Sequence, residues 1–384
     1  MTPYLLTHDK TKCSCCGSCV QVCPVNAITR ENDSMGFPYP KLNSAVCISC
    51  GKCARACHYN DDNKKTVRNE EYTAFYAGRN KSESVLQSCA SGGAFDAISR
   101  VILKKSGCVF GAKWTKDFSA VNSIAQNYSE LHQLYGSKYV FCELSHSFDL
   151  VKQKLSEKMP VLFSGTPCQV AALYSFLGHD DENLYTADII CHGVPSQKYL
   201  NIFIAELQKK YHSKVKSINF KDKEYSWRSP TLRVQFENGT EYKKPIWSSS
   251  YGQLFHNRIT VMSACNACEY AALPRKSDIT IGDFWNYDNK KYKLGDEKNG
   301  ISTIIVNSSK GNRLLNEAEI YLDLISAHKE DAMQLHLQQS AEPANPVFQE
   351  EVLRAIETFS MEEAIQSVND PNLKQRILRR LFRM

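Results

Sequence analysis

Short apolar runs alternate with segments of helical periodicity between residues 72 and 310. The apolar runs predict a β-rich stretch at residues 72–77 and strands at residues 108–114, 121–126, 161–163, 185–190, 215–220, 231–237 and 301–306. Apolar positions at helical spacing predict helices at residues 95–103, 129–135, 146–158 and 197–211. Strands that alternate with helices form layers of helices on a sheet. We therefore predict an α/β (α+β) domain, with ligands bound by the loops that follow its strands.

Beyond residue 310 the pattern is polar and helical, and it is broken at Pro343 and Pro346. No apolar run approaches the ~18 residues that would suggest a membrane span. Residues 1–4 lack the basic and apolar regions of a signal peptide. We expect a soluble, cytoplasmic protein in a reducing compartment.

The net charge of +6 is concentrated at the end of the chain. Five basic residues and no acid follow Asp370, namely Lys374, Arg376, Arg379, Arg380 and Arg383. The rest is close to neutral, which argues against a nucleic-acid groove. The tail is either a basic amphipathic helix for a partner or lipid surface, or a packed or solvated terminal helix, which we favour.

Cysteines are concentrated near the start of the chain, where nine of the sixteen fall between residues 13 and 57. Cys13, Cys16, Cys19 and Cys23 recur 34 positions later as Cys47, Cys50, Cys53 and Cys57, so this region is an internal duplication. The spacing C-x2-C-x2-C-x3-C followed by Pro is typical of bacterial ferredoxins, in which the fourth cysteine of each run binds the other cluster. Pro24 fits this pattern, whereas His58 replaces the second proline.

We therefore predict two [4Fe-4S] clusters. One is bound by Cys13, Cys16, Cys19 and Cys57, and the other by Cys47, Cys50, Cys53 and Cys23. Zinc and disulfides are the alternatives. Three thiolates at successive three-residue steps fit zinc poorly, and disulfides need an oxidising compartment. Cys15 has no assigned role.

Two further motifs lie next to predicted strands and helices: a group of four later cysteines and a Ser-Gly-Gly turn. Cys168 and Cys191 lie at strand ends, and Cys265-x-x-Cys268 is half a metal site that needs two more thiolates. Cys168 and Cys191 are the obvious candidates for these two thiolates, and zinc is one metal that the four cysteines could bind. The Ser91-Gly92-Gly93 turn opens a helix and leaves backbone N–H groups free for an anionic phosphate. On this motif alone we favour the simpler interpretation, in which Ser91 is an N-cap.

Several motifs together resemble one family. These are GTPCQ at 165–169, CHGVP at 191–195, C-x-x-C at 265–268, SDITIGD at 277–283, SGG at 91–93 and GSKY at 136–139. Over residues 72–310 they resemble the β subunit family of the coenzyme F-420 (deazaflavin) hydrogenases and dehydrogenases, to which 7-hydroxymethyl chlorophyll a reductase is related.

The resemblance implies a flavoprotein that holds FAD beside a third [4Fe-4S] cluster. Cys168, Cys191, Cys265 and Cys268 would bind that cluster. The flavin would be lined by Ser91, Gly92, Gly93, Ser137, Lys138, Tyr139 and Thr166, for which ordinary turns are the alternative. The chain has no G-x-G-x-x-G motif, so a Rossmann-type nicotinamide site is not supported.

Five other residues attract attention without a firm role. His192 and Asp283 lie in family motifs and would be proton donors near the flavin, but a structural histidine and a capping aspartate are the interpretations we favour. Cys89, Cys108 and Cys142 are expected to pack in the core.

The predicted organisation has four parts. A ferredoxin-type domain at 1–66 is followed by a flavin-binding part at 67–158, a part with the third cluster at 159–310, and a helical tail at 311–384. We expect an oxidoreductase that passes electrons from ferredoxin or a redox partner subunit through the clusters to FAD, and on to an organic or deazaflavin acceptor. The alternatives are an electron-transfer subunit of a hydrogenase- or formate dehydrogenase-like complex and, more distantly, a zinc-stapled binding protein. The sequence does not identify the acceptor.

Overall fold

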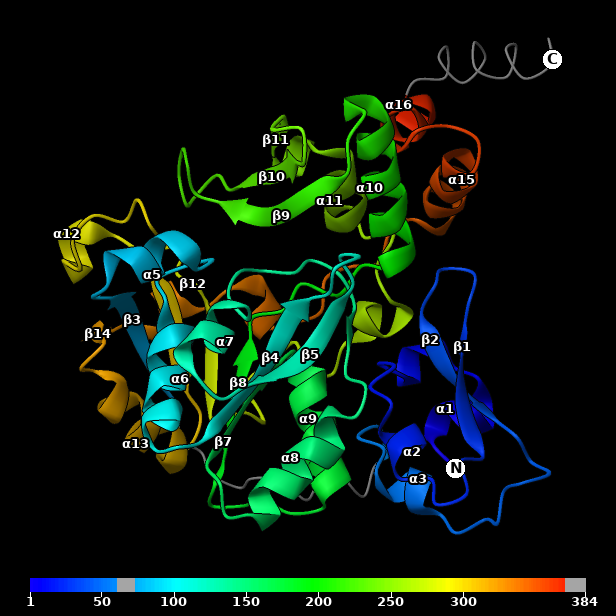
Figure 1. The fold of residues 1–384 in the computed structure, drawn as a ribbon, viewed down its shortest axis with the longest axis horizontal. Helices are drawn as coiled ribbons and strands as arrows, with labels where there is room; N and C mark the ends of the chain where they lie inside the picture. Colours follow the sequence, from blue (N-terminus) through cyan, green and yellow to red (C-terminus); the bar gives the residue numbers. More distant parts are fainter. Residues whose placement is uncertain (61–72, 370–384) are drawn as a thin grey trace.

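The computed structural model describes residues 1–60 and 73–369 (Figure 1). A small N-terminal domain contains an antiparallel hairpin of β1 and β2 and several one-turn helices. Its elements are α1 (Pro3–Thr7), η1 (Lys10–Lys12), α2 (Ser18–Gln21), β1 (Ile28–Asn32), β2 (Pro38–Leu42) and α3 (Lys52–Arg55). Both cysteine runs lie in this domain, and each leads into one of the short helices α2 and α3.

A nine-stranded sheet forms the centre of the molecule, with strand order β14-β3-β13-β12-β8-β7-β4-β5-β6. Adjacent strands β12, β8, β7 and β4 run parallel. The strands are β3 (Ala74–Asn80), β4 (Cys108–Trp114), β5 (Ala120–Ala125), β6 (Cys142–Glu143), β7 (Val161–Gly165), β8 (Leu184–Ile189), β12 (Ile279–Asp283), β13 (Ser302–Val306) and β14 (Leu322–Ser326). The strong apolar runs of the sequence occupy its middle.

Helices cover both faces of this sheet, which explains why apolar residues on its central strands are buried on both faces. Val109 and Leu162 face a core shared with α6 (Ala94–Lys104), α7 (Tyr128–His132) and α13 (Ser309–Ala318). Phe110 and Phe163 face the opposite core, shared with α8 (Ser147–Ser156) and α9 (Pro167–Leu177). Alternate residues of one strand therefore belong to different cores.

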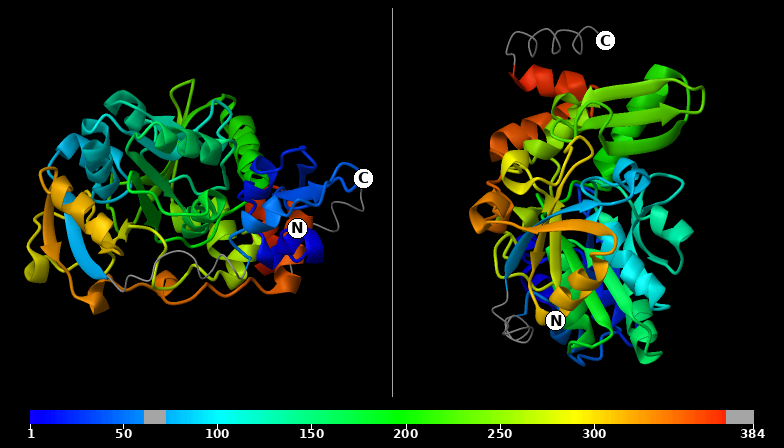
Figure 2. Two further views of the ribbon diagram at one scale, coloured as in Figure 1. Left: turned by 90° about the horizontal axis from the view of Figure 1, so that it is seen from below. Right: turned by 90° about the vertical axis from the view of Figure 1, so that its left-hand side faces the viewer.

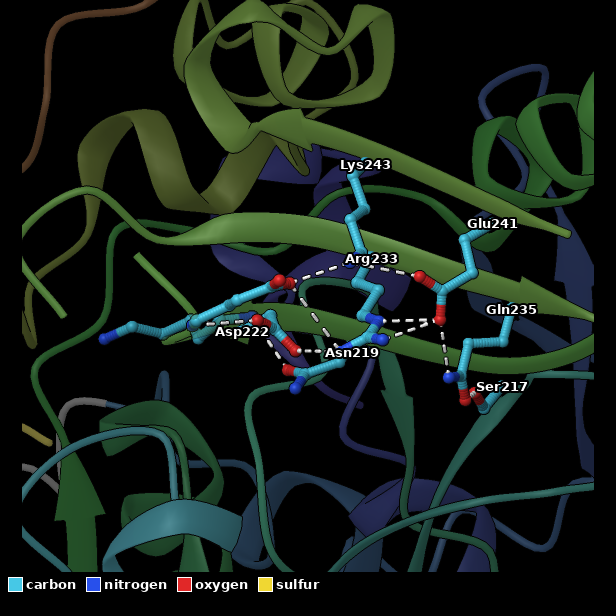
Figure 3. A network of polar contacts seen from close by, with 9 residues as sticks. Ser217, Asn219, Asp222, Arg233, Gln235, Glu241 and Lys243 are labelled. Atoms are coloured by element: carbon cyan, nitrogen blue, oxygen red, sulfur yellow. Dashed lines mark hydrogen bonds and ion pairs between the residues drawn. The ribbon is translucent and has the colours of Figure 1, made fainter. Parts of the chain in front are cut away.

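A three-stranded antiparallel sheet lies above the large sheet in Figure 1, and Figure 2 shows the two from the side. It contains β9 (Val215–Asp222), β10 (Thr231–Phe236) and β11 (Glu241–Pro245). Its core also contains residues of α10 (Gln197–Tyr211), α11 (Ser250–His256), α15 (Pro346–Ile356) and α16 (Met361–Asn369). On this sheet, Arg233 and Gln235 of the middle strand β10 both donate hydrogen bonds to the Glu241 carboxylate of β11 (Figure 3).

The remaining elements are short connections. They are α5 (Glu83–Ser88), η2 (Ile246–Ser248), η3 (Ser263–Ala267), α12 (Asn289–Tyr292), α14 (Lys329–Ala332) and η4 (Leu335–Leu337). No helix of the described residues is both long and apolar enough to cross a membrane.

The expectation of a purely helical region beyond residue 310 is wrong. Strand β14 pairs with β3 at the edge of the large sheet, so residues 322–326 belong to that sheet rather than to a tail. A five-residue edge strand in a polar segment gives a weak periodic signal. Pro346 does not merely break a helix but begins one, since Asn345 caps the N-terminus of α15. The basic tail after Asp370 lies outside the described residues.

Candidate functional site

The duplication in the N-terminal domain is also a duplication in backbone conformation. Gly17 and Gly51 are the N-caps of α2 and α3, with φ of 76° and 72°. Two positions earlier, Cys15 and Ser49 both have φ of 53°. Such positive values are uncommon outside glycine. Each run therefore forms the same tight turn before a short helix.

A cavity in this domain is lined by the thiols predicted for the first cluster. Cys13, Cys16 and Cys19 line it from the first run, and Cys57 lines it from the second. Burial is the main cause that raises the pKa of the Cys57 thiol to about 12, and the neighbouring Cys16 acts in the same direction. The fold thus brings the fourth cysteine of one run to the first three of the other, as the ferredoxin spacing predicts.

The second predicted set is more open to solvent. Cys23 and Cys53 pack against the same small core of Leu5, Cys19 and Ile28. Backbone N–H groups point at the sulfurs of this set, because Ala27 donates to Cys23 Sγ at 3.2 Å and Ser49 donates to Cys47 Sγ at 3.4 Å. Cys50 is exposed.

The four later cysteines lie close to one another at the carboxyl edge of the large sheet. Cys168 begins α9 after β7, Cys191 follows β8, and Cys265 and Cys268 lie in and after η3. Burial raises the pKa of Cys168 well above its usual range, and the other three thiols act in the same direction. Burial likewise raises the pKa of Cys191 to about 11 and that of Cys265 to about 12. Thiols in such a place become thiolates readily only when metal replaces the proton.

Two buried arginines surround this group of four cysteines. Arg258 donates to the His192 carbonyl at 2.7 Å and to Asn266 Oδ1 at 2.9 Å. Arg275 donates to the His336 carbonyl at 3.1 Å and lies 3.9 Å from the buried Asp188 carboxylate. Its Nε and Nη1 atoms are buried without a hydrogen-bond partner among the described residues.

These arginines suit an anionic group held by four thiolates. Arg275 opposes the rise in the pKa of Cys191 and Cys268, so its charge is felt at both sulfurs. Further donors are close, since Gly193 N–H donates to Cys191 Sγ at 3.4 Å and Thr166 Oγ1 lies 3.1 Å from Cys168 Sγ. The all-sulfur ligand set and the unpartnered N–H groups fit an iron-sulfur cluster.

A single-ion site is not formed by these side chains. Within residues 1–60 and 73–369, no three His, Cys, Asp or Glu side chains are close enough to bind one metal ion together. One zinc ion with Zn–S bonds of ~2.3 Å would need its sulfurs about 3.8 Å apart.

His58 and Tyr270 join the first cavity to the group of four cysteines. His58 Nδ1 lies 2.6 Å from Tyr270 Oη, and His58 Nε2 lies 2.8 Å from Ser14 Oγ. Burial raises the pKa of Tyr270, and Cys168 of the later group and Cys16 of the first run act in the same direction. His58, which replaces the second ferredoxin proline, is therefore a buried residue that connects the two cysteine groups through Tyr270.

The residues predicted to line a flavin lie along the same edge of the large sheet. Ser91, Gly92 and Gly93 approach the start of β13, and residues 137–139 precede β6. Thr166 caps α9 through a capping box with Gln169. The structure therefore brings these three segments to the edge where the four cysteines also lie.

Ser91 is not the N-cap of α6, contrary to the simpler interpretation. Gly93 takes that position with φ of 78°, while Ser91 Oγ donates to the Ile301 carbonyl at 2.9 Å. A Cβ on Gly92 would lie 2.5 Å from both the Gly78 carbonyl oxygen and the Ser302 nitrogen. The turn is thus fixed against β3 and β13.

Lys138 and Tyr139 are also held by the protein itself. Lys138 Nζ donates to the carbonyls of Leu134, Tyr135 and Gly136 at 3.2, 2.6 and 3.2 Å, and burial lowers its pKa to about 8. The Tyr139 carbonyl accepts a hydrogen bond of 2.6 Å from Tyr251 Oη.

Asp283 is not a capping residue, because it pairs with a lysine that the sequence did not single out. Buried Lys221 of β9 forms an ion pair with the Asp283 carboxylate at the end of β12, and Trp227 Nε1 donates to Asp283 Oδ1 at 2.9 Å. Trp227 stacks on Trp285 at a centroid distance of 5.3 Å. This cluster joins the small sheet to the carboxyl edge. One sequence feature could have indicated this cluster. The triplet Lys-Asp-Lys at residues 221–223 is charged, although it lies at the end of a predicted strand.

The His192 ring contacts that of His336, with ring centroids 3.9 Å apart, although His192 keeps an exposed surface. Desolvation is the main cause that lowers the pKa of His192 to about 3, and His336 acts in the same direction. A structural role for this histidine stays a prediction. Cys89 and Cys108 are buried as expected, whereas Cys142 is half-buried.

Comparison with known protein families identifies two matching regions of the chain. Residues 12–60 match the 4Fe-4S dicluster domain. The molecule is thus an iron-sulfur protein in which a ferredoxin-type domain precedes a mixed α/β domain. Residues 158–330 match the family described as the C terminus of the beta subunit of coenzyme F420 hydrogenase/dehydrogenase. This part of the chain therefore matches the family that its motifs predict, and the match supports a role related to that of oxidoreductases.

One relative matches most of the chain, and others match a short part of it. An uncharacterized protein of Methanocaldococcus jannaschii is 24% identical over 351 residues, which are 81% of this chain and 87% of that protein. NADH-quinone oxidoreductase subunit I 2 of Geobacter metallireducens is 36% identical over 58 residues, 14% of this chain and 44% of that protein. A solved structure of the F420-reducing [NiFe] hydrogenase complex from Methanosarcina barkeri covers 77% of this chain and 89% of its own, with 15% identity and a TM-score of 0.47.

Proposed function

We propose that the protein is an iron-sulfur flavoprotein oxidoreductase that passes electrons from ferredoxin or a redox partner to an organic or deazaflavin acceptor. In this proposal three [4Fe-4S] clusters carry single electrons and FAD couples them to two-electron chemistry. The eight cysteines of the N-terminal domain hold two clusters. Cys168, Cys191, Cys265 and Cys268 hold the third.

One observation carries this proposal. His58 lines the cavity of the first cysteine group and contacts Tyr270 at 2.6 Å, and the charges of cysteines from both groups act on the Tyr270 hydroxyl. Metal sites that serve only stability do not need to lie near one another. Electron transfer between two sites does require them to be close, which this contact provides.

The protein's own residues have defined parts in this proposal. Arg258 and Arg275 balance the negative charge of the third site and donate N–H groups toward it. The segments at 91–93 and 137–139, together with Thr166, offer backbone and hydroxyl groups at the sheet edge for the flavin. Lys221 and Asp283 close that edge with a buried ion pair.

Iron, acid-labile sulfide and flavin assays on anaerobically purified protein test the proposal. We expect about twelve irons per chain, since each of three clusters holds four, and one FAD. Cys168→Ser should lower the count to about eight. A wild-type protein that contains zinc and no yellow chromophore would overturn it.

A second candidate is an electron-transfer subunit that works only inside a larger complex. The relatives support it, since they include hydrogenase-4 component A of Escherichia coli, which is 44% identical over 41 residues. That match covers 18% of the relative and 11% of this chain. Turnover of reduced viologen by the isolated chain would favour the self-contained oxidoreductase.

A further inference from the structure

The two cysteine loops of the N-terminal domain have the same backbone but opposite surroundings. The first loop is covered, since Cys15 is 3% exposed and packs against Met262 and Ala264 of the large domain. The second loop is open, since Ile48 is 60% exposed and Val46 is 46% exposed on either side of Cys47. A duplicated loop therefore faces the large domain in one copy and solvent in the other.

The open loop also has a one-sided charge. The sequence has no Asp or Glu between Asp33 and Asp61, whereas Lys52 and Arg55 are both exposed on α3. In the covered half, Lys12 pairs with Glu269 and Arg30 pairs with Glu143. Lys52 forms no ion pair with any of the residues described.

We propose that Val46, Ile48, Cys50, Lys52 and Arg55 form a docking surface for a small, acidic one-electron carrier protein. This proposal rests on the proposed function, because it requires a cluster held by Cys47, Cys50, Cys53 and Cys23. On docking, the carrier is oxidised by one electron and that cluster is reduced by one. We call these five residues the loop-two surface.

The chemistry of the loop-two surface selects this kind of partner. Two exposed aliphatic side chains with a basic edge match an acidic surface that has an apolar centre, and such charges mainly accelerate and orient association. The exposed Cys50 brings the carrier's redox centre close to the second site. The covered first loop has no room for a carrier, so its electrons leave by way of the His58–Tyr270 contact.

Binding of a small acidic [2Fe-2S] ferredoxin to the anaerobic, iron-loaded protein tests the proposal. Ile48→Asp and Lys52→Glu should each raise the dissociation constant about tenfold, an effect of the size that electrostatic steering produces. Lys52→Glu should also make the dissociation constant depend less on the salt concentration. Leu6→Asp is the matched control, since Leu6 is also 60% exposed in this domain. Lys210→Glu on α10 is the charge control. Both controls should bind as the wild type does.

Reduction by methyl viologen, followed at the iron-sulfur absorbance, separates docking from redox chemistry. Viologen needs no protein surface, so it should reduce all variants at the same rate. Unchanged ferredoxin binding in Ile48→Asp and Lys52→Glu, at a normal iron count, would overturn the docking surface alone. Tight binding of a co-purifying protein to this surface, without dependence on salt, would overturn the inference that the partner is an acidic electron carrier. Missing iron in the wild type would instead overturn the proposed function.

Discussion

Cys15 and Ser49 have the same left-handed backbone conformation, with φ of 53° at each residue. They occupy equivalent positions of the two cysteine runs, 34 residues apart. Because a non-glycine residue rarely adopts this conformation, its recurrence shows that the sequence duplication is a structural one. Serine therefore adopts the backbone conformation that Cys15 has, and Cys15→Ser supplies a control for experiments on the ligands.

Cys57→Ser should remove the first cluster although Cys57 lies in the second run. Its thiol lines the same cavity as Cys13, Cys16 and Cys19, and loss of one of four ligands should lower the iron count from about twelve to about eight. Cys15→Ser should leave the count unchanged. Iron assays and electron paramagnetic resonance (EPR) of the reduced proteins would measure both. Normal iron in Cys57→Ser would contradict the exchange of fourth ligands between runs.

Arg275→Gln should lower the reduction potential of the proposed third cluster. A positive charge beside the cysteines stabilises the reduced, more negative state, and its loss should cost roughly 60 mV, about 1.4 kcal/mol for one electron. A redox titration followed by EPR gives the potential, and the iron count shows whether the cluster is retained. Arg354→Gln on α15, whose side chain is 76% exposed, is the control. An unchanged potential at full iron content would place the guanidinium away from the cluster.

Tyr270→Phe should loosen the contact between the ferredoxin-type domain and the large domain. The hydroxyl lies 2.6 Å from His58 Nδ1 and donates to the His58 carbonyl at 3.2 Å. Loss of two buried hydrogen bonds should cost about 1–3 kcal/mol and lower the midpoint of the first thermal transition. Tyr225→Phe, at a residue that is 71% exposed, should not change it. Equal midpoints for the two variants would show that the hydroxyl contributes nothing.

Strong local patterns predicted much of the fold. Strand β4 (Cys108–Trp114) and helix α10 (Gln197–Tyr211) begin and end where the sequence places them, because each has an unbroken period bounded by turn residues. The cysteine spacing likewise predicted that Cys57 joins the first run, since a fixed loop geometry underlies that motif.

Long-range relationships were not readable in the same way. The Lys221–Asp283 pair joins β9 to β12 across 62 positions, and neither neighbourhood shows which partner the fold will supply. Ser91 resembled a helix cap because local sequence cannot reveal the Ile301 carbonyl, 210 positions away. Edge strand β14 was missed because it has five residues in an otherwise polar segment and only one partner strand, β3.

Acid stability should depend on Glu241 in the small sheet. Gln235, Arg233 and Lys243 surround its carboxylate (Figure 3) and lower its pKa to about 2. Because the folded pKa lies below the unfolded value, the stabilisation is present above about pH 4.5 and is lost as the pH falls toward 2. Glu241→Gln should therefore have a slightly lower melting temperature at pH 7, with the difference vanishing near pH 2. A difference that grows on acidification would contradict this sign.

Gly92→Ala should destabilise the turn on which the proposed flavin site depends. A Cβ there would lie 2.5 Å from the Gly78 carbonyl oxygen and from the Ser302 nitrogen, and backbone on both sides cannot move without disturbing β3 and β13. We expect a loss of about 1–3 kcal/mol, as for other overpacked positions.

The iron and flavin contents of this variant distinguish two roles for Gly92. If the turn also holds FAD, Gly92→Ala should lose flavin while it retains iron, because the cysteines lie on other loops of the same edge. Gly178→Ala at the end of α9 is a useful control, since nothing lies within 4 Å of its added Cβ and only the cost of its φ of 78° remains. Full flavin in a destabilised Gly92→Ala protein would mean that the glycine serves only the packing of β3 against β13.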